Sequence, residues 1–445
     1  MQAIHPIKLL LLSFLVWLFF YMQLPVTYLY NGSIWFPLLT LILFVIVFCL
    51  GIFSLKTSSI KIKPLASNKK LKQIAYLFFF IGLFGIVLKI YIGVFKSGIY
   101  TANDIFEQRL ENMGKELSGG AIGAIASMLY PFSFVGLLIG IYNYKLFNKV
   151  YLFIIIVFGF YPIIETFFMG GRTIIALLGT TIIFVSYASF FKNTTFKIVK
   201  FKVLKTTLAS LPKFLFKKKV LIPLAIIAVL FVSYSIKVLD TRLTRFNYGD
   251  RVFQVWEQKD YQWVKFDNDF KQDFYGASKE EKSKMLGLFS LKHYFVHGIF
   301  EYVRLVNELE KTTGYYYGQY EFNVFFKFFK MLGIPLKSFG ELSVVVKRQA
   351  VYQTFWGPFY IDFGLFGVII MFFWGRFTKR IYTYAKRGST PHLIFYSYLS
   401  TIIITSFFIN FLLGSSSYFL FAFLASLLIF KYWPNNLNFV TKDKI

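Results

Sequence analysis

Long apolar stretches, most of them roughly 17 to 25 residues, recur along the whole chain between short polar segments. A helix of this length crosses the hydrocarbon core of a bilayer, which is about 30 Å thick, because each residue advances the helix by about 1.5 Å. The pattern predicts an all-α, polytopic integral membrane protein with about ten transmembrane helices. The predicted spans are Ile7–Leu24, Ile34–Ser54, Ile74–Phe95, Ala121–Tyr142, Val150–Phe168, Thr173–Phe190, Val220–Ile236, Phe359–Trp374, Leu393–Leu413 and Tyr418–Phe430.

The polar segments between the spans are of two kinds. Those with basic residues and no acid are Lys56–Lys72, Lys192–Lys219 and Arg376–Arg387. The positive-inside rule assigns such segments to the cytoplasm, and an even number of predicted spans separates them. The other face is mixed, because Lys96–Gly120 carries four acids and fourteen more follow between positions 240 and 341. Both termini are therefore predicted to lie in the cytoplasm.

This topology divides the chain into four parts. Residues 1–236 form an N-terminal membrane bundle of about seven helices, 237–357 form one large periplasmic or extracellular loop, 358–430 form the last three helices, and 431–445 form a cytoplasmic tail. Two stretches of the loop, Tyr294–Val306 and Phe322–Leu332, repeat apolar residues at helical spacing. We expect them to be amphipathic helices that lie in the membrane interface or pack back on the bundle.

Composition supports a bilayer protein, since 57% of the residues are hydrophobic and the mean hydropathy is +0.59. A net charge of +28 would also suit nucleic acid, but the basic residues lie in separate blocks between spans. We therefore expect no nucleic-acid partner. The single cysteine, Cys49, lies in an apolar span, so neither a disulfide framework nor thiol chemistry is predicted.

The turn Gly170-Gly171-Arg172-Thr173 joins two predicted spans on the outer face. The glycines allow close backbone approach, and the arginine begins a helix whose amide groups and positive dipole end point the same way. This combination suits a diphosphate ligand. An arginine at a span end also serves as an anchor that reaches the lipid headgroups, so both interpretations stay open for Arg172.

Further arginines fall on the same predicted face, several of them close to span ends. Guanidinium groups suit phosphate because they present a fixed fork of donors and never deprotonate. For each of these residues a purely structural role is equally open. The additional candidates for binding the diphosphate or glycan are Arg109, Arg242, Arg245, Arg304 and Arg348.

Two of the four histidines, His293 and His297, lie in the large loop at i, i+4 spacing. That spacing could hold a metal, but no third ligand stands at a recognisable distance, so neither a metal nor another cofactor is expected. A general base for a sugar hydroxyl is the more attractive role, because histidine titrates near neutral pH. A surface histidine without a role is the remaining alternative.

Ionisable residues inside predicted spans form the last group of candidates. Asp362 lies near the outer end of the eighth span, and Glu165 lies two turns before Arg172, on the same predicted helix face. An unpaired buried carboxylate is expensive, so each should face a cavity or a cation. Helix pairing or capping is the alternative for Asp362. With Lys89 as the other mid-span ion, a proton relay is not supported.

Three sequence stretches together resemble O-antigen or capsule repeat-unit polymerases of the Wzy type. They are Gly170-Gly171-Arg172 between two spans, Thr313-Gly314-Tyr315-Tyr316-Tyr317-Gly318-Gln319 in the loop, and Phe355-Trp356-Gly357-Pro358-Phe359-Tyr360-Ile361-Asp362-Phe363-Gly364-Leu365-Phe366-Gly367 opening a late span. Their order and the large loop before the last three spans fit the family as well. The most specific element is Tyr360-Ile361-Asp362-Phe363-Gly364.

The resemblance implies a metal-independent glycosyl polymerase of the bacterial inner membrane, with its active site on the outer face. Such enzymes transfer a growing glycan en bloc from undecaprenyl diphosphate to the non-reducing end of a new lipid-linked repeat unit, building O-antigen or capsular polysaccharide. The implied partners are these lipid-linked oligosaccharides, membrane lipid and a chain-length regulator protein. Arg172 would bind the diphosphate, His297 or His293 would act on the acceptor hydroxyl, and Asp362 would shape the site.

Two other functions are weighed against this expectation. An O-antigen ligase shares the architecture and donor but uses another acceptor. A lipid-linked oligosaccharide flippase or other transporter needs ionisable groups through the middle of several spans, and it does not need a loop of over a hundred residues on one face. The charge pattern favours the polymerase over the transporter and separates it poorly from the ligase.

Overall fold

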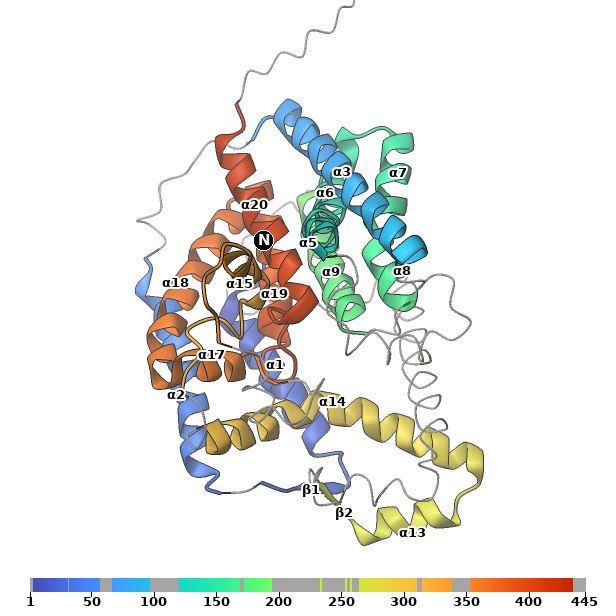
Figure 1. Ribbon diagram of the computed structural model, residues 1–445, viewed down its shortest axis with the longest axis vertical. Helices are drawn as coiled ribbons and strands as arrows, with labels where there is room; N and C mark the ends of the chain where they lie inside the picture. The colour runs from blue at the N-terminus through green and yellow to red at the C-terminus, as the bar shows by residue number, and fades with distance from the viewer. Residues whose placement is uncertain are drawn as a thin grey trace, which may run out of the picture.

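A computed structural model describes residues 3–30, 32–56, 66–96, 120–168, 172–193, 264–309, 314–337 and 353–434, together with Ser233, Phe253 and Glu257. Nearly all of this part is helical (Figure 1). The helices before residue 200 are α1 (Pro6–Tyr21), α2 (Trp35–Ser54), α3 (Asn68–Tyr91), α5 (Gly120–Leu129), α6 (Pro131–Tyr142), α7 (Lys149–Gly159), α8 (Tyr161–Phe168) and α9 (Thr173–Asn193). Those that follow are α13 (Asn268–Gly276), α14 (Lys279–Leu309), α15 (Asn323–Met331), α17 (Trp356–Phe363), α18 (Gly367–Lys386), α19 (Thr390–Ile404) and α20 (Ser417–Tyr432).

Helices long and apolar enough to cross a membrane number seven in the described residues. The chain is therefore helical with the spans of a membrane protein, as predicted. The stretches are Trp35–Ser54, Asn68–Lys96, Gly120–Tyr142, Lys149–Thr166, Thr173–Lys192, Trp356–Lys386 and Gly414–Tyr432. The first and ninth predicted spans correspond to α1 and α19, which are apolar but shorter. The predicted span Val220–Ile236 lies outside the described residues except for Ser233.

Three of the spanning stretches contain two α-helices each where the sequence pattern predicts one helix: Gly120–Tyr142, Lys149–Thr166 and Trp356–Lys386. Pro131 begins α6, where its missing N–H costs nothing, so α5 and α6 meet at Tyr130. The predicted span Phe359–Trp374 lies within the spanning stretch Trp356–Lys386, but this stretch is not one continuous α-helix, because a 3-10 turn over Gly364–Phe366 separates α17 from α18. Gly364 has φ +54°, a conformation that glycine adopts without strain.

Glycines bring two pairs of helices into backbone contact. A Cβ at Gly51 on α2 would overlap the carbonyl oxygen of Phe372 on α18, and a Cβ at Gly375 would overlap that of Phe48. α3 and α6 meet in the same way, with Gly82 against the backbone of Ser133. Small residues allow such close approach, which helps helices associate where lipid removes the hydrophobic driving force.

The long helix α14 lies across one end of the bundle (Figure 1), where it packs against α1, α2 and α17. It contains the predicted amphipathic stretch Tyr294–Val306, and α15 matches the second one. The strands β1 (Val26–Tyr28) and β2 (Val264–Phe266) pair antiparallel beside α13, with Thr27 opposite Lys265. This short sheet, which the all-α prediction did not include, ties the α1–α2 connection to the segment before α13.

The two ends of the bundle differ in charge as the topology predicts. α3 begins and α20 finishes at the end opposite α14 (Figure 1), so Lys69, Lys72 and Lys431 belong to that end. Acids such as Asp269 and Glu280 belong to α13 and α14 at the other end. The assignment of these ends to cytoplasm and exterior stays a prediction.

Candidate functional site

Five of the predicted site residues fall within the described part of the chain, and α14 connects them. Arg172 precedes α9 and contacts α14; His293, His297 and Arg304 belong to α14; Asp362 is on α17, which packs against α14. The remaining candidates lie outside the described residues: Gly170, Gly171, Arg109, Arg242, Arg245 and Arg348.

Arg172 is held against the side of α14 by Tyr294. Its backbone carbonyl accepts from the Ala176 N–H at 3.0 Å, which fixes it to the first turn of α9. Its guanidinium carbon lies 4.5 Å from the centre of the Tyr294 ring, and Nη2 donates to the Tyr294 hydroxyl at 2.6 Å. Arg172 is half-buried and forms no ion pair with any described residue. A cation that is stacked on a neutral ring keeps its charge available for an anion.

His297 lies next to this pair. The rings of Tyr294 and His297 meet edge to face with centroids 5.7 Å apart. His297 Nδ1 is 2.7 Å from the carbonyl oxygen of His293, and a carbonyl only accepts, so Nδ1 carries the proton. In the neutral ring Nε2 is then the basic nitrogen. Both histidines are 3% exposed, which rules out the alternative of a surface histidine.

His293 belongs to an aromatic stack that reaches the small sheet. Its ring stacks on His297 at 4.8 Å and on Phe289 at 5.6 Å, and its Nδ1 is 2.8 Å from the hydroxyl of Tyr28 on β1. Burial raises the pKa of Tyr28 well above its usual value, so the phenol stays neutral. His293 is therefore a structural contact between α14 and β1.

Arg304 has a very different environment. It is buried, and its Nε lies 3.1 and 3.2 Å from the two carboxylate oxygens of Glu301, while its Nη1 and Nη2 contact Glu308 and Glu301. Burial alone would lower the pKa of this guanidinium, but the two carboxylates outweigh that effect and raise it. The charge of Arg304 is thus already balanced inside the protein, which suits an internal ion pair better than a ligand contact.

Asp362 joins two of the stretches that carry the family resemblance. Its carboxylate accepts from the backbone N–H groups of Tyr320 and Glu321 at 2.9 and 2.8 Å, and its carbonyl accepts from Tyr317. A Cβ at Gly364 would overlap the ring of Tyr315, so glycine lets the loop close on α17. The Asp-Phe-Gly element therefore fastens the loop Gly314–Phe322 to the bundle.

Glu321 is a buried acid that the sequence pattern did not single out. It is fully buried and accepts from Nδ2 of Asn410 at 2.8 and 3.1 Å. Burial raises its pKa well above the usual value, and the nearby Asp362 raises it further, while the hydrogen bonds from Asn410 act in the opposite direction. A strongly perturbed acid marks either a functional group or a structural one. With no exposed surface, Glu321 here connects three segments: the loop, α17 and the α19–α20 connection.

The two other intramembrane ions pair with each other. Lys89 Nζ on α3 lies 3.3 Å from Glu165 on α8. The prediction that Glu165 and Arg172 share one helix face is wrong, because α8 finishes at Phe168 and Arg172 precedes a separate helix, α9. Glu165 therefore neutralises Lys89 rather than facing Arg172.

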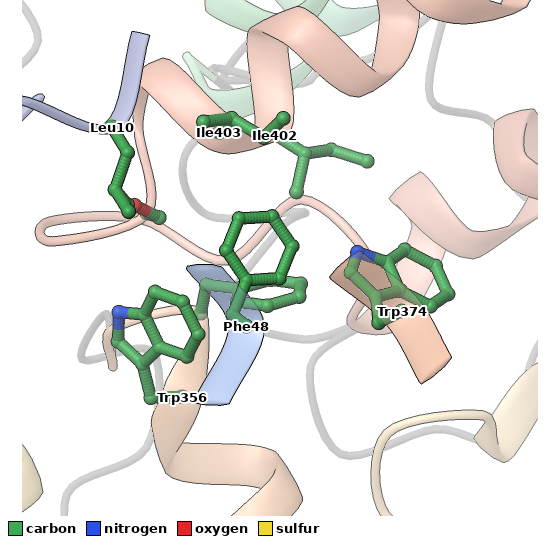
Figure 2. Close-up of a pocket in the computed structure, with 8 residues that line it drawn as sticks. Leu10, Phe48, Trp356, Trp374, Ile402 and Ile403 are labelled. Atoms are coloured by element: carbon green, nitrogen blue, oxygen red, sulfur yellow. The ribbon is translucent and has the colours of Figure 1, made fainter. Parts of the chain in front are cut away.

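The pocket in Figure 2 is not a saccharide site. It lies among α1, α2, α17, α18 and α19, and its volume of about 10 Å³ suits a single water molecule. Apart from Ser406, its walls are Leu10, Phe48, Phe355, Trp356, Trp374, Ile402 and Ile403. Over the ranges that the structure describes, no group of three or more His, Cys, Asp or Glu side chains is placed to hold a metal ion.

Comparison with known proteins gives no family for this chain. No family model, curated protein or solved structure matches it. Its function is therefore inferred from its residues and their geometry. The strongest local arrangement is the one around Arg172, where an arginine without a carboxylate partner, a tyrosine and a histidine meet on α14.

Proposed function

We propose that this chain is a membrane glycosyltransferase that polymerises lipid-linked repeat units, transferring a glycan from undecaprenyl diphosphate to the non-reducing end of the next unit. The observation that carries the proposal is Arg172, a half-buried guanidinium that stacks on Tyr294 and has no counter-ion among the described residues. The proposal places this site on the outer face of a bacterial inner membrane. O-antigen or capsular polysaccharide is the product class.

The chemistry needs a group that stabilises a departing diphosphate. An acceptor hydroxyl attacks the anomeric carbon of the carrier-linked glycan, the bond from that carbon to the diphosphate oxygen breaks, and the diphosphate leaves with the electron pair. A guanidinium placed at that oxygen stabilises the charge that develops there. Arg172 is suited to this role because it is half-exposed and its charge is not neutralised by a described carboxylate.

The acceptor hydroxyl must also lose a proton. His297 has the suitable tautomer, with Nε2 as its basic nitrogen, but both histidines are buried in the aromatic stack. Proton acceptance by either one requires that stack to open. Arg172 needs no such movement, so the proposal depends on the arginine first.

The alternatives predict different products. A ligase would act on another acceptor, and a transporter would use the intramembrane ions that here form the Lys89–Glu165 pair. In a deletion strain, a missing polymerase leaves single repeat units on the cell surface. A missing ligase leaves no attached glycan, and a missing flippase leaves lipid-linked units in the cytoplasmic leaflet.

The direct test replaces Arg172 in a strain that depends on this gene. We expect Arg172→Ala to abolish chain extension at unchanged protein level, and Arg172→Lys to restore it only in part because lysine lacks the planar fork. Arg380→Ala is the matched control, since Arg380 is an exposed arginine on α18. The length distribution of surface glycan on gels is the measurement. Normal chain length with Arg172→Ala would overturn the proposed role.

A further inference from the structure

Tyr294 contacts Arg172 in two different ways at once. Its hydroxyl accepts from Nη2 at 2.6 Å, and its ring lies under the guanidinium at 4.5 Å. A side chain with several rotatable bonds, such as arginine, loses much of its freedom when one face and one nitrogen are both held. The remaining Nε and Nη1 donors then keep a fixed direction.

The backbone on both sides of this contact is itself well fixed. Arg172 is joined to the first turn of α9 through its carbonyl, and Tyr294 lies within the 31-residue helix α14. The edge of the same Tyr294 ring meets His297, whose Nδ1 is tied to the backbone of α14. Tyr294 thus contacts both the arginine and the histidine.

We propose that Tyr294 is a positioning residue, which holds the Arg172 guanidinium in the orientation that receives the diphosphate of the lipid carrier. This inference rests on the proposed function, because it takes Arg172 as the diphosphate contact. It assigns the anion-binding strength of the site to a pair of residues, an arginine that carries the charge and a tyrosine that orients it. Preorganised donors bind an anion more tightly because less conformational freedom is lost on binding.

The experiment measures the affinity of the purified full-length protein for inorganic diphosphate, by titration calorimetry in detergent. Tyr294→Phe keeps the ring under the guanidinium and removes only the hydroxyl, and we expect it to weaken binding by roughly tenfold. Tyr294→Leu removes the ring as well and should weaken binding further. Arg172→Ala should weaken binding most, to a low affinity that is still measured at high diphosphate concentration.

Tyr302→Phe is the matched control on the same helix. Its hydroxyl makes a hydrogen bond of 2.7 Å with Thr40 and touches no arginine in the described structure. We expect this variant to bind diphosphate as tightly as the unchanged protein. A loss of affinity in Tyr302→Phe equal to that in Tyr294→Phe would show a general effect on α14 and overturn the inference.

The double variant Arg172→Ala with Tyr294→Phe separates positioning from direct binding. If Tyr294 acts through Arg172, the double variant equals Arg172→Ala. Two results would overturn the inference and leave the proposed function standing. One is a lower affinity in the double variant than in Arg172→Ala. The other is unchanged affinity in both Tyr294 variants while Arg172→Ala loses affinity. Unchanged affinity in Arg172→Ala overturns both. The unfolding midpoint of each unliganded variant shows that the protein is folded.

Discussion

Two arginines contact the same helix, α14, and their surroundings give them opposite characters. Arg172 meets the middle of that helix through a neutral tyrosine, and it remains half-buried with its charge unbalanced by any described carboxylate. Arg304 lies in the C-terminal half, buried between Glu301 and Glu308. The same residue type thus serves as a ligand-binding candidate at one point of the helix and as an internal ion pair about three turns later.

The difference extends beyond the arginines. Aromatic rings surround the histidine pair near Arg172, whereas two carboxylates, those of Glu301 and Glu308, contact Arg304. Electrostatic role follows from this local environment and not from the residue type. The Arg304 region should therefore control stability, and the Arg172 region should control activity.

The largest expected effect on stability comes from Glu301→Gln. This change leaves the Arg304 guanidinium buried with only Glu308 as a negative partner. We expect the free energy of unfolding to fall by about 3 kcal/mol, the typical cost of breaking a buried ion pair. Thermal unfolding in detergent measures it. If Glu301→Gln were as stable as the unchanged protein, the Arg304 region would not differ from the Arg172 region in its contribution to stability.

The next effect depends on pH and involves Glu321. Its pKa is raised in the folded protein, so its contribution to stability is complete below its ordinary pKa of 4.5 and is lost as the pH rises through the folded value. The free energy of unfolding should fall by at most about 1.4 kcal/mol per pH unit in that window. Glu321→Gln should flatten the curve of unfolding midpoint against pH. An identical pH slope in both proteins would contradict the assignment.

A smaller loss is expected for Glu308→Gln. Glu308 is the second carboxylate on Arg304, but its side chain is 27% exposed, against 2% for Glu301. Water can replace part of its interaction, so the free energy of unfolding should fall by about 1 kcal/mol or less. Measuring the unfolding of Glu301→Gln and Glu308→Gln under one condition tests whether the more buried carboxylate contributes more to stability. A larger loss of stability in Glu308→Gln than in Glu301→Gln would contradict this explanation.

The smallest effect on stability is expected for Arg172→Ala, the variant with the largest expected effect on activity. Removing a half-buried cation from one tyrosine should change the free energy of unfolding by less than about 1 kcal/mol. Unfolding in detergent and glycan length in cells are measured on the same variant. Strong destabilisation together with lost activity would make Arg172 another structural arginine.

Apolar length alone predicts most of the membrane helices, because a bilayer demands roughly 20 apolar residues for each span. It does not reveal the interruption at Gly364, since apolar residues continue on both sides and only the backbone conformation changes. Apolar length also does not predict that the strand Val26–Tyr28 pairs with the strand Val264–Phe266. Each strand has three residues, and their partners are far apart in the sequence.

The site is predictable in part. The sequence assigns Arg172 and the histidines to one face, but the contact between Arg172 and Tyr294 joins residues 122 positions apart and depends on how α9 packs near α14. Glu321 resembles the other acids of the loop by composition. Only the approach of Asn410 and Asp362 reveals that it is buried.

The glycines between α2 and α18 and between α3 and α6 have a mechanical consequence. At the glycine contacts no side chain separates the two helices of a pair, so we expect each pair to move as one unit. Relative movement of the helices is then expected between the two pairs and not within either of them. That boundary holds α19 and α20, where the buried rings of Phe395, Tyr398 and Phe423 stack on one another.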